Sequence, residues 1–445
     1  MKHIFRQTLL GAAVILACSA SQGMNLLQAY QAAVDQDASI RASRAALDSG
    51  RERLPQARSQ LLPSVSASVG RNNNNLTTTA PNLLGSLSET RDTYFSFNKT
   101  VALRQPIFNL QRVYQYQQSQ DQVAESEATY DKDLQSLSVR VGGAYLEALL
   151  SAEQLRLVRA QKAQYTAMVD AARKSFAAGT GTRTDIDDAQ ARLDMAIASE
   201  LEAMQNEDYT RRQLEILVNQ SVTSIDQLNV NGLRALPSVS TTLAEWIDEA
   251  MRNSPEIKAL EARLEASDME IAKAKAAHAP TLDGVLQWSD SGSENITRIN
   301  ARYENKVMGV QLNVPLFQGG YVNSVVRQAV AEKTRTQEGL EALRRDLNLR
   351  VHKEYRGVTE GLLRMKALEQ AVRSAELLLD STLKSQRAGV RTRLDVLNAE
   401  QQLATATRDL VQSRYLYLMS RLRLNSLVGK EALATITELN QAFQP

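Results

Sequence analysis

Two stretches of the chain alternate apolar and polar residues, a pattern typical of strands with one apolar face. In the first stretch, Val65, Ala67 and Val69 alternate with serines. In the second, two runs carry apolar residues at every other position, namely Leu282, Gly284, Leu286 and Trp288, and then Met308, Val310, Leu312 and Val314. Runs of about nine to eleven residues fit a tilted strand that crosses a bilayer. We therefore predict one β-hairpin at about 64–105 and another at about 281–315, with polar loops at 71–90 and 289–304.

Long stretches without proline follow each predicted hairpin. No proline occurs between Pro106 and Pro237, or between Pro315 and Pro445, and both stretches are rich in Ala, Leu, Gln, Glu and Arg, which favour helix. One glycine site in each stretch forces a stop, which predicts helices at about 109–178, 184–218, 318–388 and 393–428. The first of these would be roughly 100 Å long. Rods of this length need partners along their whole surface.

The apolar spacing in these helices identifies the partners as other helices. In the first long helix, from Tyr130 to Val158, the residues of one face recur at intervals that alternate between four and three residues, as in the seam of a coiled coil. The last helix repeats this seam from Val396 to Leu427 and adds a second stripe at Tyr415, Leu418 and Leu422. Two stripes suit a helix that packs between two neighbours, as in a cylinder.

The whole pattern occurs twice. A shift of 217 residues aligns Pro63 with Pro280, and a shift of 210 aligns TRTD at Thr182 with TRLD at Thr392. We interpret the chain as a tandem duplication with a first repeat at 24–235, a second at 236–430 and a C-terminal tail at 431–445. Two independent domains are the alternative, but the segment between the copies is short and poor in Pro and Gly.

Four strands have a consequence for assembly. They cannot close a barrel, and an open sheet edge cannot lie in lipid, so a membrane-embedded chain of this kind must oligomerise. Eight strands from a dimer and twelve from a trimer are both allowed. A soluble α+β protein with an ordinary sheet is the alternative, and the length of the helices argues against it.

The N-terminus resembles an export signal. Lys2 and Arg6 precede the apolar stretch 9–17, which predicts a signal peptide at 1–23 that is removed together with the only cysteine, Cys18. The segment ILAC ending at Cys18 is an imperfect lipoprotein box, so an acylated N-terminus is the alternative. After the leader no run of about 18 apolar residues predicts a membrane helix. The 52 basic and 50 acidic residues give no reason to expect nucleic acid as a partner.

Taken together, these features resemble the TolC family of outer-membrane efflux and secretion ducts. The similarity runs from about Asn25 to Gly429 and is most specific at APTLDGVLQ from Ala279, LNVPLFQGGYVNSVVRQA from Leu312 and GVRTRLDVLNAEQQL from Gly389. The resemblance implies an α+β membrane protein, in which a homotrimer forms a 12-stranded outer-membrane β-barrel continuous with a long periplasmic α-helical barrel. It also implies location in the outer membrane of a Gram-negative cell, in contact with outer-membrane lipid and extending into the periplasm.

The same resemblance implies a function. The chain would be an exit duct for efflux or type I protein secretion, opened by untwisting of helices at the periplasmic tip. Its partners would be a periplasmic adaptor (membrane fusion protein) and an inner-membrane transporter of the ABC or RND type. The alternative is a periplasmic coiled-coil adaptor or scaffold, but an adaptor needs one helical hairpin and soluble β domains rather than two equivalent strand pairs.

The resemblance also implies a gate at this tip. The family's arginine matches Arg391, its first acid matches Asp395, and their partners in the first copy match Thr184 and Asp185. Two further gate positions depart from the best-known member of the family, which has a tyrosine at Gln386 and a second acid at Asn398. A two-tier ring of carboxylates is therefore in doubt.

A purely structural interpretation covers some of these residues. Thr182 with Asp185, and Thr392 with Asp395, have capping-box spacing at a helix start. Arg391 discriminates between the two interpretations, because its counterpart Gly181 has no side chain and capping requires neither residue. The pairs Ala178-Gly179 and Ala388-Gly389 would suit docking of an adaptor, although a simple helix C-cap explains the glycines equally well.

Nothing in the sequence indicates an enzyme. Apart from His3 in the leader, His278 and His352 are isolated, and neither has a partner at metal-ligand spacing. The glycine-rich GTGTRT at Gly179 lacks the ending of a phosphate-binding loop and does not follow a strand. We therefore predict no catalytic residues, no metal and no cofactor.

Overall fold

The computed structural model describes residues 23–81, 85–237, 242–293 and 301–443. The predicted signal peptide, apart from residue 23, lies outside the described residues. These residues form two compact units. We call them the helical unit (residues up to 41, 133–250 and 349 onward) and the sheet unit (42–132 and 251–348). Among the described helices, none combines the length and the apolar character that a transmembrane helix needs.

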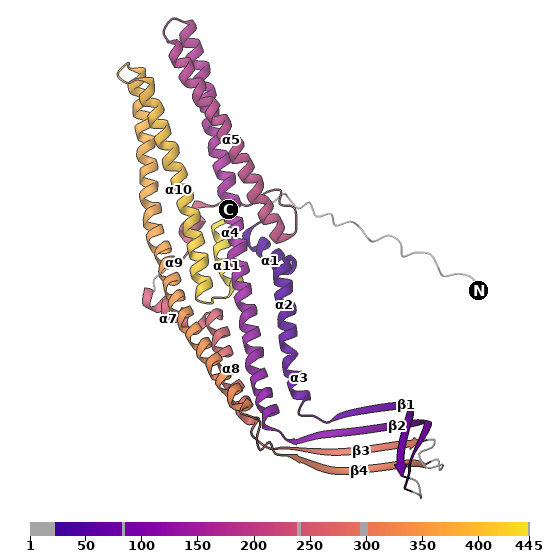
Figure 1. Ribbon diagram of the computed structural model, residues 1–445. Helices are drawn as coiled ribbons and strands as arrows, with labels where there is room; N and C mark the ends of the chain where they lie inside the picture. The colour runs from indigo at the N-terminus through magenta and orange to yellow at the C-terminus, as the bar shows by residue number, and fades with distance from the viewer. Residues whose placement is uncertain (1–22, 82–84, 238–241, 294–300, 444–445) are drawn as a thin grey trace, which may run out of the picture. The chain divides into compact units, whose positions relative to one another are not determined.

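Two very long helices begin in the sheet unit and end in the helical unit. They are α4 (Leu110–Ala177), with 68 residues, and α9 (Tyr321–Arg387), with 67. Each turns back into a second helix, α5 (Arg183–Val218) or α10 (Arg393–Leu427). Figure 1 shows α4 beside α5 and α9 beside α10, each pair closed by a tight turn. The predicted long helices are confirmed within a few residues of their expected bounds.

Shorter helices complete both units. The helical unit adds α1 (Leu26–Gln36), α6 (Val230–Ala235), most of α7 (Leu243–Asn253), α11 (Ala432–Asn440) and a 3₁₀ turn (Gln441–Phe443). The sheet unit holds most of α2 (Ala38–Arg51), together with α3 (Arg53–Ser59) and α8 (Pro255–Ala276). The order of elements therefore repeats, with helices, a strand pair and a long helical hairpin in each copy.

The four strands form one antiparallel sheet in the order β1-β2-β3-β4. Their bounds are Ser64–Pro81, Leu87–Phe108, Thr281–Ser293 and Ala301–Asn313. The pairing of β2 with β3 joins the strand pair of the first copy to that of the second. Strands β1 and β4 are consequently the two edges of the sheet.

The register gathers most of the apolar residues of the four strands on one face. Val65 lies opposite Leu103, Leu103 opposite Leu286, and Leu286 opposite Met308. Neighbouring rows of the same face add Ala67, Val101, Trp288, Val310 and Leu312. Val65, Met308 and Val310 are 68%, 85% and 72% exposed, respectively. Nothing among the described residues of this chain covers this apolar face of the sheet.

Lys99 lies on the same face, where a charge would be costly in lipid. Its Nζ is 3.8 Å from Oδ2 of Asp290, and Arg302 donates to both oxygens of that carboxylate at 2.7 and 2.9 Å. These charged residues follow directly after the row of Val101 and Trp288. Phe97 and Phe95 of β2 lie beyond this row on the same face, so the charges stand between apolar residues of β2. The register of β2 against β3 shifts between Pro106 and Phe108.

Three local expectations differ from the structure. The loop expected at 71–90 is mostly strand, since β1 and β2 stay paired from Arg71 opposite Phe97 to Pro81 opposite Leu87. The loop expected at 289–304 is also shortened, because β3 reaches Ser293 and β4 begins at Ala301. Strand pairing uses backbone hydrogen bonds, which Asn and Thr side chains do not prevent, so polar side chains alone did not end these strands. The segment expected as a C-terminal tail instead forms α11 and the 3₁₀ turn, with Ile436 and Phe443 buried.

Candidate functional site

The predicted gate residues lie at the two turns that close the helical hairpins, and the turns have the same backbone. Gly179 and Gly389 have φ angles of 72° and 77°, and nothing would lie within 4 Å of a Cβ at either position. After the first glycine, the N–H of Thr180 donates to the carbonyl of Ser175 at 2.9 Å, and the N–H of Val390 makes the corresponding bond at 2.9 Å. This left-handed glycine ending satisfies the last carbonyls of α4 and α9.

Both returning helices begin with a complete capping box. The N–H of Asp185 donates to Thr182 Oγ1 at 3.2 Å, and the N–H of Thr182 donates to Asp185 Oδ2 at 2.9 Å. Thr392 and Asp395 make the same two bonds at the same distances. Hydrogen bonds from the threonine lower the pKa of both carboxyl groups. The capping interpretation of these residues is therefore confirmed.

The two turns differ at Arg391. Its Nη1 donates to Oδ1 of Asp395 at 3.5 Å, and the two side chains are 59% and 34% exposed. Gly181 stands at this position in the first turn, where a Cβ would lie 3.1 Å from that of Ser175. Among the described residues of this single chain, Arg391 makes no hydrogen bond or ion pair to Thr184 or Asp185.

The remaining predicted residues surround these turns. Thr184 and Asn398 are exposed, and Gln386 is half-buried at the end of α9. Ala178 and Ala388 are exposed beside their glycines. The structure thus places Thr184 and Asp185 at the turn of the first hairpin, and Gln386, Arg391, Asp395 and Asn398 at the turn of the second. The charge of Arg393 in the second turn helps to lower the pKa of Asp185.

Sequence reasoning missed a stripe of α10 that contacts the first hairpin. Leu397 packs in a buried cluster with Tyr165 of α4 and Ala196 of α5. One turn further along α10, the side chain of Gln401 accepts a bond from Gln161 of α4 at 3.4 Å. The counterpart of Leu397 in the first copy is Asp187, an exposed residue paired with Arg183. When the two copies are aligned at the shift of 210 residues, the second copy has a leucine where the first has an acid. This difference could have revealed the stripe from the sequence.

The capping boxes predict a local response to mutation and to pH. Replacing Thr182 by Ala should destabilise the start of α5 by about 1 kcal/mol. Because the folded pKa of Asp185 is lowered, the carboxylate's contribution is complete above its ordinary value of 3.8 and is lost as the pH falls through the folded value. Hydrogen exchange of peptides covering 182–190, corrected for intrinsic rates, measures both effects. The variant Thr184→Ala is the matched control, and equal protection in both variants would contradict the role of Thr182.

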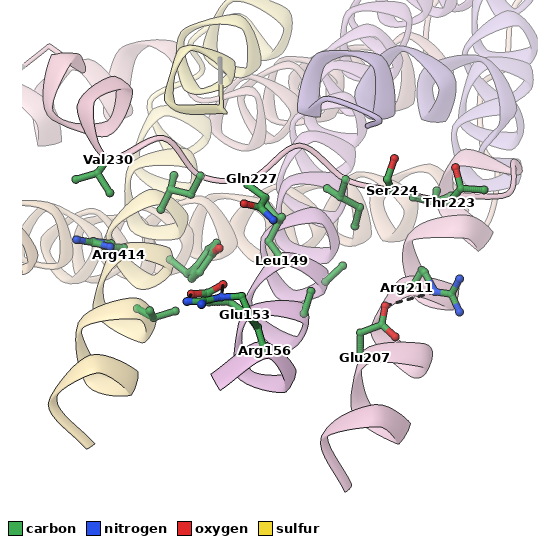
Figure 2. Close-up of a pocket in the computed structure, with 17 residues that line it drawn as sticks. Leu149, Glu153, Arg156, Glu207, Arg211, Thr223, Ser224, Gln227, Val230 and Arg414 are labelled. Carbon is green, nitrogen blue, oxygen red and sulfur yellow. Dashed lines mark hydrogen bonds and ion pairs between the residues drawn. The ribbon is translucent and has the colours of Figure 1, made fainter. Parts of the chain in front are cut away.

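A separate cavity of about 630 Å³ lies within the helical unit, between α4, α5, α10 and the segment 222–230 (Figure 2). Its arginines are engaged by acids. Arg156 pairs with Glu153, and Arg211 is 3.6 Å from Glu207, as the dashed line in Figure 2 marks. The third arginine of the lining, Arg414, lies 3.6 Å from Glu369, so each guanidinium has an acid nearby, although the buried Nε atoms of Arg211 and Arg414 donate no hydrogen bond within the described residues. We assign it no ligand.

The fold, with a strand pair and a long helical hairpin in each copy, is that of an outer-membrane channel. The solved outer-membrane channel CmeC of Campylobacter jejuni matches it with a TM-score of 0.79 at 15% identity, over 95% of this chain and 90% of CmeC. The family model described as "Outer membrane efflux protein" matches residues 29–220 and 246–430. The chain therefore belongs to the outer membrane efflux protein family.

Individual relatives span nearly the whole chain. It is 33% identical to the alkaline protease secretion protein AprF of Pseudomonas aeruginosa, over 95% of this chain and 88% of AprF. It is 30% identical to the proteases secretion protein PrtF of Dickeya chrysanthemi, over 99% of this chain and 95% of PrtF. It is 28% identical to the outer membrane protein TolC of Escherichia coli, over 98% of this chain and 88% of TolC. These comparisons confirm the TolC-family resemblance, and the relatives are channel proteins rather than enzymes.

Proposed function

We propose that three copies of this chain close an outer-membrane duct. The observation that carries this proposal is the sheet, whose four strands leave two free edges and an uncovered apolar face. Lipid tolerates such a sheet only when its edges are paired, as they are in a closed barrel. Three protomers would supply twelve strands, with β4 of each pairing with β1 of the next. The repeats at 24–235 and 236–430 would then be equivalent sixths of one ring.

The duct would serve protein secretion in the first instance. AprF and PrtF, at 33% and 30% identity, are both named for the secretion of proteases. We propose that an inner-membrane transporter of the ABC or RND type delivers the cargo through a periplasmic adaptor that docks at Ala178-Gly179 and Ala388-Gly389. Both glycine turns are exposed and open, which leaves room for a partner helix. Such a protein would be located in the outer membrane and reach into the periplasm, with its signal peptide removed.

Assembly provides the first test. Outer-membrane fractions should contain the chain as a trimer that migrates as a large species when unheated and as a single chain after boiling. The reason is that paired edges of a closed barrel resist detergent until they are heated. A monomer found only in the soluble periplasmic fraction would overturn the proposal in favour of a periplasmic adaptor or scaffold.

The gate would lie at the hairpin tips, where Arg391 and Asp395 of each protomer approach the axis together with Thr184, Asp185, Gln386 and Asn398. Three copies of Asp395 would form an anionic ring while each also caps its own helix. In support, Asp395 is only partly covered and is bonded to Arg391, so its carboxylate can face a pore. Transport in this subunit would be passive and would begin when the tip helices untwist.

Replacing Arg391 or Asp395 by Ala should loosen the closed state and raise single-channel conductance in planar bilayers. Arg183→Ala is the control, because Arg183 occupies the first tip, is 77% exposed and pairs with its own helix at Asp187. Conductance that matches the wild type in both test variants would defeat the gate assignment while leaving the duct intact.

A further inference from the structure

A second cavity, of about 520 Å³, lies within the helical unit and is bounded by all four long helices. Gln154 and Gln161 of α4 line it, with Glu202 and Asn206 of α5. Leu379 of α9 and a longer run of α10 complete the wall, including Glu400, Leu403 and Arg408. This volume is in the range of sites that hold a drug-sized molecule. The cavity adjoins the stripe of α10 described above, because the hydrogen-bonded pair Gln161 and Gln401 lines it.

One carboxylate oxygen in this wall is buried without a hydrogen-bond donor. Oε2 of Glu400 is buried and accepts no hydrogen bond from any described residue. Burial raises the pKa of this carboxyl group. A buried carboxylate oxygen without a donor is costly, and a cation placed beside it would recover that cost.

The other charges of the wall do not neutralise Glu400. Arg408 is 59% exposed, and its Nε lies 3.6 Å from Asp409, outside the cavity. Glu202 of α5 is exposed and adds a second negative charge to the lining. The formal charge of the lining is therefore negative, with two acids against one arginine. An anionic ligand would be repelled, and a purely apolar one would leave Glu400 unpaired.

The rest of the wall is amphipathic. Leu157 and Val158 of α4, Leu379 and Leu403 supply apolar surface, while glutamines and Asn206 supply amide groups. We infer that this cavity is a binding site for an amphipathic organic cation, whose positive centre pairs with Glu400 and whose apolar groups contact the leucines. The site contains no gate residue and lies within one protomer, so only the choice of nanodiscs for its test rests on the proposed function. Its ligand would contact both helical hairpins of one protomer.

The duplication supplies a conservative variant. The counterpart of Glu400 in the first copy, 210 residues earlier, is Gln190, so Glu400→Gln places in α10 the residue that α5 already holds there. This change keeps the side-chain shape and removes only the charge. Glu376→Gln, on α9 and outside the cavity lining, is the matched control for loss of one negative charge.

The test is isothermal titration calorimetry of the full-length protein in nanodiscs of phosphatidylcholine, with empty nanodiscs as the blank. The probe is tetraphenylphosphonium, and triphenylphosphine oxide is the neutral comparison. We expect the cation to bind the wild type and Glu376→Gln equally, to bind Glu400→Gln at least tenfold more weakly, and to bind better than the neutral probe. Leu403→Trp, which fills the cavity, should also block binding. Equal affinity for Glu400→Gln and wild type, or no binding above the blank, would overturn the assignment.

Discussion

A Val310→Arg variant is expected to fail to assemble in the outer membrane. Val310 is 72% exposed on β4, between Met308 and Leu312 on the apolar face of the sheet. An arginine near the middle of a lipid-facing strand costs about 2–4 kcal/mol. The amount of heat-modifiable trimer in outer-membrane fractions measures this loss, with total expression determined in parallel.

The neighbouring residue provides a matched control. Gln311 follows Val310 on the same strand, so its side chain points to the opposite, polar face, where it lies across from Asp283. Gln311→Arg should therefore assemble close to wild-type levels. Equal recovery of the two variants would show that the apolar face does not contact lipid, whatever the state of assembly.

An Arg421→Ala variant should lose about 3 kcal/mol of stability, as expected when one partner of a buried ion pair is removed. The Arg421 side chain is 6% exposed and pairs with Glu438 of α11, to which its Nε donates at 3.0 Å. Its Nη1 donates to the carbonyl of Pro237 at 2.7 Å and to the hydroxyl of Tyr417 at 3.2 Å. Loss of the guanidinium would leave all three acceptors without this donor.

Thermal unfolding at a fixed scan rate measures this effect. Arg408→Ala is the control, because Arg408 lies on the same helix but is 59% exposed in a surface pair, which is worth about 1 kcal/mol or less. Digestion of α11 by protease should accelerate in Arg421→Ala and not in the control. Matching unfolding temperatures in the two variants would mean that α11 does not depend on the buried ion pair.

The strands and long helices could be predicted because their periodicity reflects burial on one side. Val65, Leu286 and Val310 alternate with polar residues and share one face, as the register confirms. The strand ends could not be predicted, because the Asn and Thr residues after Arg71 remain paired with β2 but show no alternation of apolar and polar residues. Helix α11 was missed because it is short and its burial depends on packing against α10 and against α1, of which α1 is distant in sequence.

The candidate site was predictable only in part. The capping role of Thr182 and Asp185 follows from local spacing, and the structure confirms it. The contact of Leu397 with Tyr165 depends on how two hairpins meet, which a coiled-coil pattern does not specify. The buried oxygen of Glu400 that lacks a donor could not be predicted from the sequence for the same reason. The gate and docking roles depend on neighbouring protomers and partners, so they remain proposals.

We propose above all that copies of this chain form a closed duct through the outer membrane. Single-channel recording of the purified wild-type protein in planar bilayers tests this most directly. We expect discrete conductance steps that appear only with the unheated trimer and are lost when it is boiled to single chains. A correctly folded protein that inserts into the bilayer and passes no current under any voltage would contradict it.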